Sequence, residues 1–398
     1  MSRLDKVVDY AVERDVAPFV VAMIAGRDGI KWEHSAGHAN TTHLASPDTV
    51  FGLFSMTKAI GSLMAIMAVD RGLITLDTPV GDVLPDFDRL QVLEAMTPEG
   101  PRYRKPKTRA NLRHLLTHTS GMGYEAFYPL MAEYARVTGA PSDVTGTLES
   151  LNYPLLFEPG EGFAYGISTD WVGALISKLD GRPIEQFVQE EILNPLDMTS
   201  TFFERTQTGD RLANLVLKHE DGSFEPHEMF PAPNPEIYHM GNALYGSARD
   251  YMSFLQLVLN RGVHNGKRVV GEAAMQLMFE NQLGAVSLPT PVLKSYIPNI
   301  SYDVEPCPGL RKTHTAAFFR TEDAVPGMRA AGSLTWAGVL NTHYWIDPDR
   351  EIAVLFMTQM MPFCDPDFMT CFQDFERAVC DEFPPKSPGV QATLHSAG

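Results

Sequence analysis

The chain has 398 residues, of which 44% are hydrophobic, and its formal net charge is −17. A chain of this length and apolar content can bury a large core, and its size suggests two lobes on one continuous framework. The acidic balance argues against nucleic acid as a partner, because phosphate recognition needs clustered lysine and arginine. It also disfavours strongly anionic substrates.

The hydropathy pattern of the chain bears on where the protein is located. Residues 1–14 have helical periodicity without the apolar core of a signal peptide, which predicts a cytoplasmic location. We expect no membrane span, because no run of 18 or more apolar residues occurs. The four cysteines lack C-x-x-C spacing and are expected to be free thiols, while residues 385–398 predict a disordered tail.

Strand patterns occur near both ends of the chain. Residues 18–37 predict a β-hairpin that turns at Gly26-Arg27-Asp28-Gly29. Residues 332–356 predict further strands, two of them around an Asp-Pro-Asp-Arg turn at 347–350. These segments would complete one antiparallel sheet.

The middle of the chain has helical patches and long loops instead of strands. We therefore predict an α/β (α+β) fold with two lobes. Residues 1–85 and 241–384 would form a discontinuous α/β lobe, and residues 86–240 would form an inserted, mostly helical lobe. A catalytic cleft is expected at the junction of the two.

Ser55 and Lys58 lie one helical turn apart at the start of an apolar run over 59–69 that ends at Arg71-Gly72. The positive end of the helix dipole and burial against the run both favour the neutral amine of Lys58. A neutral amine beside a serine can accept its proton for nucleophilic attack. About one S-x-x-K is expected by chance in a chain this long, so the assignment depends on its context.

Two further segments supply that context. A glycine-punctuated loop over 159–168 carries Tyr165 just before a helix predicted to start near Ser168. Residues 332–339 predict a small-residue strand edge, where backbone N–H groups can approach a substrate closely. In isolation Tyr165 is a packed loop tyrosine, and its pairing with Ser55 and Lys58 makes it a candidate for the site.

Over about residues 5–380 the chain resembles the serine β-lactamase and penicillin-binding-protein superfamily, in particular the class C-like branch that contains the family VIII carboxylesterases. Several ordered signatures beyond S-x-x-K carry this resemblance. They are LDTPV at 76–80, NLRHLLTHTSG at 111–121, NPLDM at 194–198 and YGSARDY at 245–251.

The resemblance implies a β-lactamase/transpeptidase-like fold, with an antiparallel sheet flanked by helices. It implies Ser55 as the acylated nucleophile, with Lys58 and Tyr165 sharing proton transfer. The backbone N–H groups of Ser55 and Val339 would form the oxyanion hole. Such a donor stabilises the developing carbonyl charge by roughly 3–4 kcal/mol.

The chain departs from the lactamase pattern at two polar positions. Lactamases of this superfamily carry Tyr-x-Asn and Lys-Thr-Gly, whereas this chain has Ile167 and Trp336 in place of the asparagine and lysine. Ile167 cannot hydrogen-bond a substrate amide, and Trp336 cannot pair with a carboxylate as lysine can. An aromatic–glycine third motif resembles the esterase branch, where an apolar wall suits a neutral acyl or alcohol group.

The substrate pocket is expected to combine motif residues with aromatic residues of a loop. The candidates are Trp336, Gly338, Ile167, Tyr124, Phe127 and Tyr128, framed by the proline-rich loops 231–240 and 286–293. His114 and His118 lack the glutamate of H-E-x-x-H and a third ligand, so we expect structural roles for both and no metal. The absence of G-x-S-x-G argues against a Ser-His-Asp hydrolase.

The sequence therefore predicts a cofactor-free serine carboxylesterase that hydrolyses small neutral, short-chain esters through a Ser55 acyl-enzyme. The alternatives within the superfamily are a β-lactamase, a D-amino-acid peptidase or amidase, and an acyltransferase that passes the acyl group to an alcohol. A binding protein without turnover is a third class. The expected partner is a small-molecule ester, and no oligomeric state is predicted.

Overall fold

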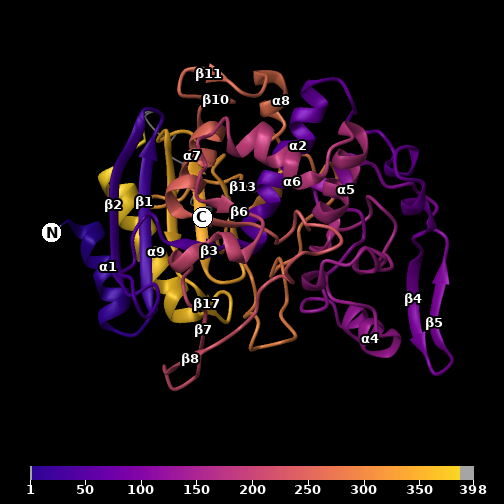
Figure 1. Cartoon of the computed structure of the whole chain (residues 1–398), viewed down its shortest axis with the longest axis horizontal. Coiled ribbons are helices and arrows are strands. Elements are labelled where there is room, and N and C mark those ends of the chain that lie inside the picture. The colour runs from indigo at the N-terminus through magenta and orange to yellow at the C-terminus, as the bar shows by residue number, and fades with distance from the viewer. Residues whose placement is uncertain (1, 386–398) are drawn as a thin grey trace, which may run out of the picture.

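A seven-stranded antiparallel sheet forms one side of the molecule in the computed structural model, which describes residues 2–385 (Figure 1). All but the first residue of the predicted tail lie outside the described residues. In sheet order the strands are β12 (Lys312–His314), β13 (Phe319–Thr321), β14 (Leu334–Gly338), β15 (Thr342–Asp347), β16 (Ile352–Met357), β1 (Phe19–Gly26) and β2 (Gly29–Gly37). The predicted hairpin and the predicted strands near 330–360 are therefore confirmed in one sheet.

Helices cover both faces of the sheet, because successive strand residues point to opposite sides. Val20 and Ile24 of β1 pack with α1 (Arg3–Glu13) and α9 (Pro366–Glu382). Val21 and Met23 face the larger core, which includes α7 (Ala248–Leu259). The sheet thus joins the two ends of the chain and supports the site from behind.

The remaining elements include short helices and small sheets. The helices are α2 (Thr57–Asp70), α3 (Leu112–Leu116), α4 (Pro129–Thr138), α5 (Ser168–Asp180), α6 (Ile184–Val188) and α8 (Glu272–Gln276). The strands are β3 (Val50–Gly52), β4 (Val92–Thr97), β5 (Gly100–Arg104), β6 (Thr201–Phe202), β7 (Val216–Lys218), β8 (Phe224–Pro226), β9 (Tyr245–Ser247), β10 (Val263–His264), β11 (Lys267–Arg268) and β17 (Met360–Met361). In Figure 1, α4 and the hairpin β4–β5 lie on the side opposite α1 and β2. The lobe boundaries at 85 and 240 stay a prediction.

Helix α2 runs through the larger core, and every residue from Thr57 to Ala68 is buried. A helix that is apolar on all sides needs such a position. A Cβ on Gly61 would lie 2.8 Å from Cγ2 of Thr169, so glycine lets α2 and α5 pack closely. Because Tyr165 lies in the loop that leads into α5, this packing brings the loop tyrosine to the start of α2.

None of the helices within residues 2–385 is long and apolar enough to cross a membrane. All four cysteines are free thiols. The cytoplasmic location stays a prediction.

Candidate active site

Ser55 lies in a short 3-10 turn, Phe54–Met56, between β3 and α2. Phe54, directly before it, has a φ of +43°, which is unfavourable for a side chain with a Cβ. The preceding segment is held by β3–β9 pairing and by the amide of Leu53, which donates to the carbonyl of Leu244 at 2.9 Å. Backbone strain of this kind persists where the surroundings impose it, often at functional sites. The strained turn presents Ser55 to a pocket that it lines.

The amine of Lys58 is buried and donates to three oxygens. It contacts the Ser55 Oγ at 3.4 Å, the Tyr124 hydroxyl at 2.8 Å and the Gly241 carbonyl at 2.9 Å. Burial lowers the pKa of Lys58 to about 8, although the carboxylates of Asp170 and Asp143 act in the opposite direction. A substantial fraction of the amine is therefore neutral near pH 8.

The three contacts also orient the neutral amine. The Gly241 carbonyl can only accept a hydrogen bond, and the Tyr124 hydroxyl can accept the second N–H. The lone pair of the tetrahedral nitrogen then points to the remaining neighbour, the hydroxyl of Ser55. The predicted Ser55–Lys58 pair is therefore close together and oriented for proton transfer.

Tyr165 lies beside this pair, with its ring centre 4.9 Å from the Lys58 amine. Its hydroxyl accepts a hydrogen bond from the indole nitrogen of Trp336 at 2.9 Å. Burial raises the pKa of Tyr165, while hydrogen bonding with Ser55 and with Trp336 acts to lower it. Because the indole can only donate, it fixes the phenol oxygen and leaves the phenol proton of Tyr165 free for another acceptor.

Gly338 ends strand β14 next to the Ser55 turn. A Cβ on Gly338 would lie 2.5 Å from the carbonyl oxygen of Leu53, so only glycine permits this backbone approach. Val339 follows and lines the same pocket as Ser55. The two residues predicted for the oxyanion hole thus lie at one cavity, and their N–H roles stay a prediction.

The pocket at Ser55 has a volume of about 240 Å³ and a mostly apolar wall. Four of the six predicted pocket residues line it, namely Trp336, Ile167, Tyr124 and Phe127. The other lining residues include Phe54, Asp143, Val144, Tyr153, Met229, Asn242, Leu293, Ile297, Ile300 and Phe363. Most come from loops whose approach to Ser55 has no local sequence signal.

Two of the predicted pocket residues lie elsewhere. Tyr128 lies behind the loop, where its hydroxyl accepts a hydrogen bond from the Tyr165 amide at 3.0 Å. Gly338 packs against the backbone at Leu53 and is not among the lining residues. Both therefore support the site instead of forming its wall, because their contacts are to backbone groups.

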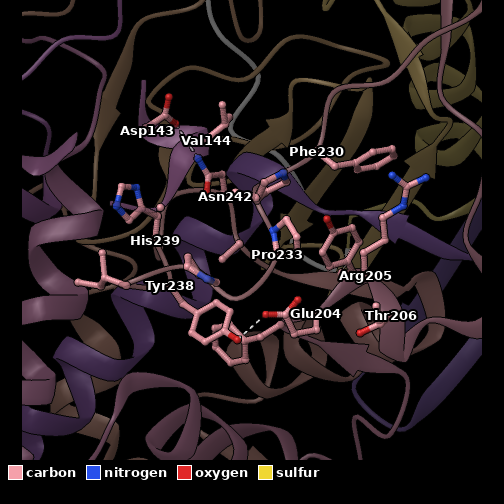
Figure 2. Close-up of a pocket in the computed structure, with 18 of the residues that line it drawn as sticks. Asp143, Val144, Glu204, Arg205, Thr206, Phe230, Pro233, Tyr238, His239 and Asn242 are labelled. Atoms are coloured by element: carbon pink, nitrogen blue, oxygen red, sulfur yellow. Dashed lines mark hydrogen bonds between the residues drawn. The ribbon is translucent and has the colours of Figure 1, made fainter. Parts of the chain in front are cut away.

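A second cavity of about 630 Å³ adjoins the first, and Figure 2 shows its walls. The predicted framing loop 231–240 lines this second cavity, whereas loop 286–293 contributes Leu293 to the first. The two cavities share Asp143, Val144 and Asn242. The Asn242 amide donates to the Asp143 carboxylate at 2.6 Å, which makes a polar partition between them.

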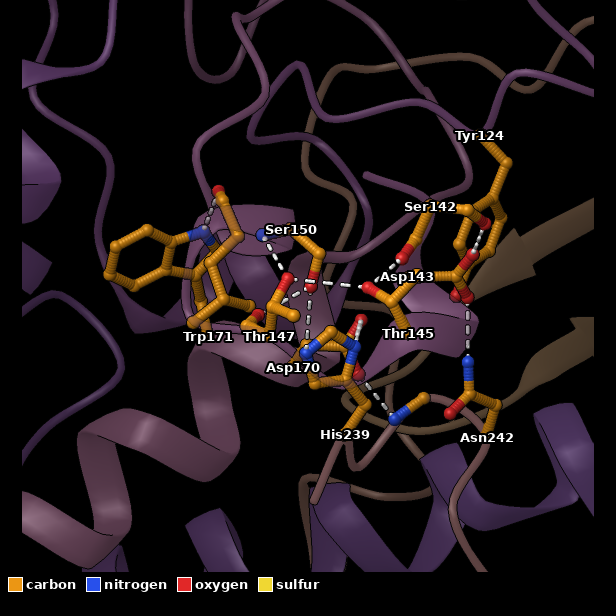
Figure 3. A network of polar contacts seen from close by, with 12 residues as sticks. Tyr124, Ser142, Asp143, Thr145, Thr147, Ser150, Asp170, Trp171, His239 and Asn242 are labelled. Atoms are coloured by element: carbon orange, nitrogen blue, oxygen red, sulfur yellow. Dashed lines mark hydrogen bonds and ion pairs between the residues drawn. The ribbon is translucent and has the colours of Figure 1, made fainter. Parts of the chain in front are cut away.

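A polar network lies behind Lys58 and was not predicted from the sequence (Figure 3). Asp170, in the first turn of α5, is fully buried and accepts from the Gly241 amide at 2.6 Å. Its other oxygen lies 3.7 Å from Nδ1 of His239. The available signal was an aspartate directly before the apolar residues Trp171 and Val172 of a predicted helix, since buried carboxylates need partners.

Among the described residues, no group of three or more His, Cys, Asp and Glu side chains is placed to hold a metal ion. Nδ1 of His114 accepts from the Asn111 amide at the start of α3. The His118 ring packs on Tyr165 with ring centres 4.7 Å apart. Both histidines therefore have structural contacts.

Comparison with known proteins gives consistent relationships. The Beta-lactamase family model matches residues 4–368. Acyltransferase calJ of Penicillium decumbens is 31% identical over 344 residues, which cover 83% of this chain and 81% of that protein. Lovastatin esterase of Penicillium rubens is 27% identical over 329 residues, 81% of this chain and 82% of that protein. A mutant simvastatin synthase from Aspergillus terreus superposes with a TM-score of 0.82, 27% identity and 96% coverage of both chains.

The family model spans nearly the whole described chain, and the matched range includes Ser55, Lys58, Tyr165 and Trp336. In the structure Ser55 contacts Lys58, and Trp336 contacts Tyr165. The sheet order and helix placement are those of the β-lactamase/transpeptidase-like fold. The chain therefore belongs to the Beta-lactamase family and is an enzyme of its serine hydrolase and acyltransferase kind.

Proposed function

We propose that this protein is a carboxylesterase of the family VIII type, which takes acyl groups from small neutral esters onto Ser55 and releases them to water. The observation that carries the proposal is the hydrogen bond from Trp336 to Tyr165 inside an apolar pocket. Trp336 stands where a lactamase of this superfamily offers a cationic lysine. The pocket therefore has an aromatic wall in place of a carboxylate-binding group.

The proposed chemistry needs only this chain's own groups. The Ser55 hydroxyl gives its proton to the Lys58 amine, and its oxygen forms a bond to the ester carbonyl carbon. The carbonyl oxygen becomes an oxyanion, which the amides of Ser55 and Val339 would stabilise. The alcohol then leaves with a proton returned from Lys58, relayed by Tyr165. Water then gives a proton to Lys58 and bonds to the acyl carbon. The bond from that carbon to Oγ of Ser55 breaks, the carboxylic acid leaves, and Lys58 returns a proton to the Ser55 oxygen.

The apolar wall of the pocket supports selectivity for neutral esters. A penicillin bound here would desolvate its side-chain amide beside Ile167 and its carboxylate beside Trp336. Each unpaired neutral group costs about 1–3 kcal/mol and a charged one more. A short neutral ester carries neither group, so it avoids both penalties.

Acyl transfer to an alcohol is the second candidate, and two observations favour it. The relative from Penicillium decumbens, 31% identical over most of both chains, is named an acyltransferase. A second cavity of about 630 Å³ also shares a wall with the Ser55 pocket, which leaves room for an acceptor alcohol. In this candidate the alcohol replaces water in the second half of the cycle.

A panel of p-nitrophenyl esters of graded acyl length, run beside nitrocefin and benzylpenicillin, tests the proposal. We expect kcat/KM for a short-chain ester to exceed that for benzylpenicillin at least ~100-fold, consistent with two desolvation penalties. Comparable values would favour a lactamase. Product analysis with added alcohol separates the two candidates, because a transferase yields the new ester while an esterase yields only the acid.

The nucleophile has its own test. A fluorophosphonate probe should label Ser55, as read by mass spectrometry of the peptide, and Ser55→Ala should lose both label and turnover while keeping its circular dichroism spectrum. Labelling at another serine would remove Ser55 from the proposal.

A further inference from the structure

Asp170 is a fully buried carboxylate with an incomplete set of partners. One oxygen accepts the Gly241 amide at 2.6 Å, and the other has no hydrogen bond within the described residues. On that side, Nδ1 of His239 lies 3.7 Å from the carboxylate. A buried carboxylate is costly unless a charge or several donors compensate it. A nearby cation would therefore stabilise the ionised form of Asp170.

Gly241 separates this carboxylate from the Lys58 amine (Figure 3 shows the Asp170 side). The glycine amide donates to Asp170, and the carbonyl of the same residue accepts from Lys58 at 2.9 Å. A Cβ placed on Gly241 would lie 2.6 Å from the Asp170 oxygen and 3.1 Å from the Lys58 nitrogen. The two charged atoms are therefore within about 6 Å of each other, a range in which opposite charges interact.

We propose that Asp170 is a positioning residue that balances the positive charge formed on Lys58 when it takes the proton of Ser55. This inference rests on the proposed function. The proton leaves Oγ of Ser55, the bond from Oγ to the acyl carbon forms, and Lys58 becomes an ammonium. Burial raises the pKa of Asp170, while His239 and then Lys58 act to lower it. In the proposed step the Asp170 carboxylate neither gains nor loses a proton. Gly241 keeps the two charges close, because any side chain would stand between them.

Other titratable groups also face Lys58. Tyr124 and Tyr165 place their rings on it, His118 packs on Tyr165, and Asp143 acts on it from the pocket wall. Burial raises the pKa of both phenols and lowers that of His118, so these three groups are neutral near pH 7.

Asp143 is the competing counter-charge. It is only half-buried, and it already accepts hydrogen bonds from Ser142 and Asn242. Asp170 is fully buried with one free oxygen and has the larger effect on the pKa of Lys58. Asp170 is therefore the stronger partner of the ammonium.

The decisive measurement is the pH profile of kcat/KM for Asp170→Asn with a neutral p-nitrophenyl ester, read at the isosbestic wavelength of p-nitrophenol. Asparagine keeps an oxygen for the Gly241 amide and removes the charge. Losing a nearby anion lowers the pKa of Lys58, so the acidic limb should move about one unit to lower pH. The plateau should fall about tenfold, because the ammonium loses its counter-charge. A lower plateau with an unmoved limb would reduce Asp170 to a structural role and overturn the proposal.

Asp250→Asn is the matched control. Asp250 is also buried in the first turn of a helix, where it accepts from Ser200 and Thr201. It is not among the carboxylates that act on the pKa of Lys58. We expect its acidic limb to stay at the wild-type pH. If both variants shift equally, the effect is not specific to Asp170 and the inference fails.

A direct titration separates this inference from the proposed function. In protein labelled with ¹³Cε-lysine, the NMR signal of Lys58 is the one that the Lys58→Arg variant lacks. The titration midpoint of this signal should lie at lower pH in Asp170→Asn than in the wild type, whether or not any ester is hydrolysed. Equal midpoints would overturn the inference even in an active esterase. If Asp170→Asn does not fold, Gly241→Ala inserts a methyl between the two charges, and the same downward shift is expected.

Discussion

The indole nitrogen of Trp336 donates a hydrogen bond to the Tyr165 hydroxyl at 2.9 Å. The sequence predicts Trp336 in the pocket wall, and in the structure it lines the pocket and also makes this contact. The donor fixes the phenol oxygen and leaves the phenol proton free for another acceptor. The residue that replaces a lactamase lysine therefore positions the tyrosine as well as excluding charge from the pocket.

Trp336→Phe keeps an aromatic wall and removes the donor. We expect kcat on a short-chain ester to fall about tenfold, equivalent to one hydrogen bond of about 1.4 kcal/mol, with KM changed less than about threefold. Steady-state kinetics checks this. A large rise in KM at constant kcat would instead assign the indole to substrate binding alone.

Lys58→Ala and Tyr165→Phe should each lower kcat by several orders of magnitude. The double variant should lose much less than the two losses combined, because groups that act as one unit are not additive. Measuring kcat for the wild type, the two single variants and the double variant completes this double-mutant cycle. Fully additive losses would show that the two side chains work independently, and near-normal activity of Tyr165→Phe would remove the tyrosine from the mechanism.

The pH dependence of kcat/KM should report the buried amine. The pKa of Lys58 is lowered to about 8 by burial, and the neutral form is the proton acceptor. Activity should therefore rise with pH up to an apparent pKa near 8 and level off above it. A pH profile with a neutral ester measures this. A profile that is flat from pH 6 to about 9 would contradict a titrating base at this position.

Glu376→Gln should destabilise the sheet side of the molecule. Glu376 on α9 accepts from the Arg329 amide and guanidinium, at 2.7 Å to Nε, and both side chains are buried. Removing the negative charge leaves a buried guanidinium without compensation, at a cost of about 3–5 kcal/mol. Chemical denaturation measures the loss. Asp381→Asn, which breaks the exposed ion pair of α9 with Arg3, should cost less than about 1 kcal/mol.

The same pair predicts acid sensitivity. Burial alone would raise the pKa of Glu376, but Arg329 holds it below its usual value. A carboxylate with a depressed folded pKa stabilises the protein above its unfolded pKa, about 4.3, and this stability is lost as pH falls through the folded value. The wild type should therefore lose more stability than Glu376→Gln between about pH 5 and pH 3. Equal losses would show that the pair does not contribute.

The local geometry of the site was predictable from sequence. Three-residue spacing across the 3-10 turn and the start of α2 places Ser55 by Lys58. The turn at 26–29 and the alternation along 18–37 specify the first hairpin. Ordered family motifs identified Tyr165 and Trp336 as members of the same site. These features depend on residues that are neighbours in the chain or on the order of motifs, so they can be predicted from a single sequence.

The chemical state of the amine depended on tertiary structure. The Lys58 amine is held by Tyr124 and Gly241, which are 66 and 183 positions away, and it lies near Asp170. Tyr128 likewise became a support of Tyr165 instead of a pocket wall. Burying a charge-bearing group requires partners that chain folding brings from distant segments. Periodicity and spacing report only local faces, so which oxygens and carboxylates meet an amine is decided when the segments pack.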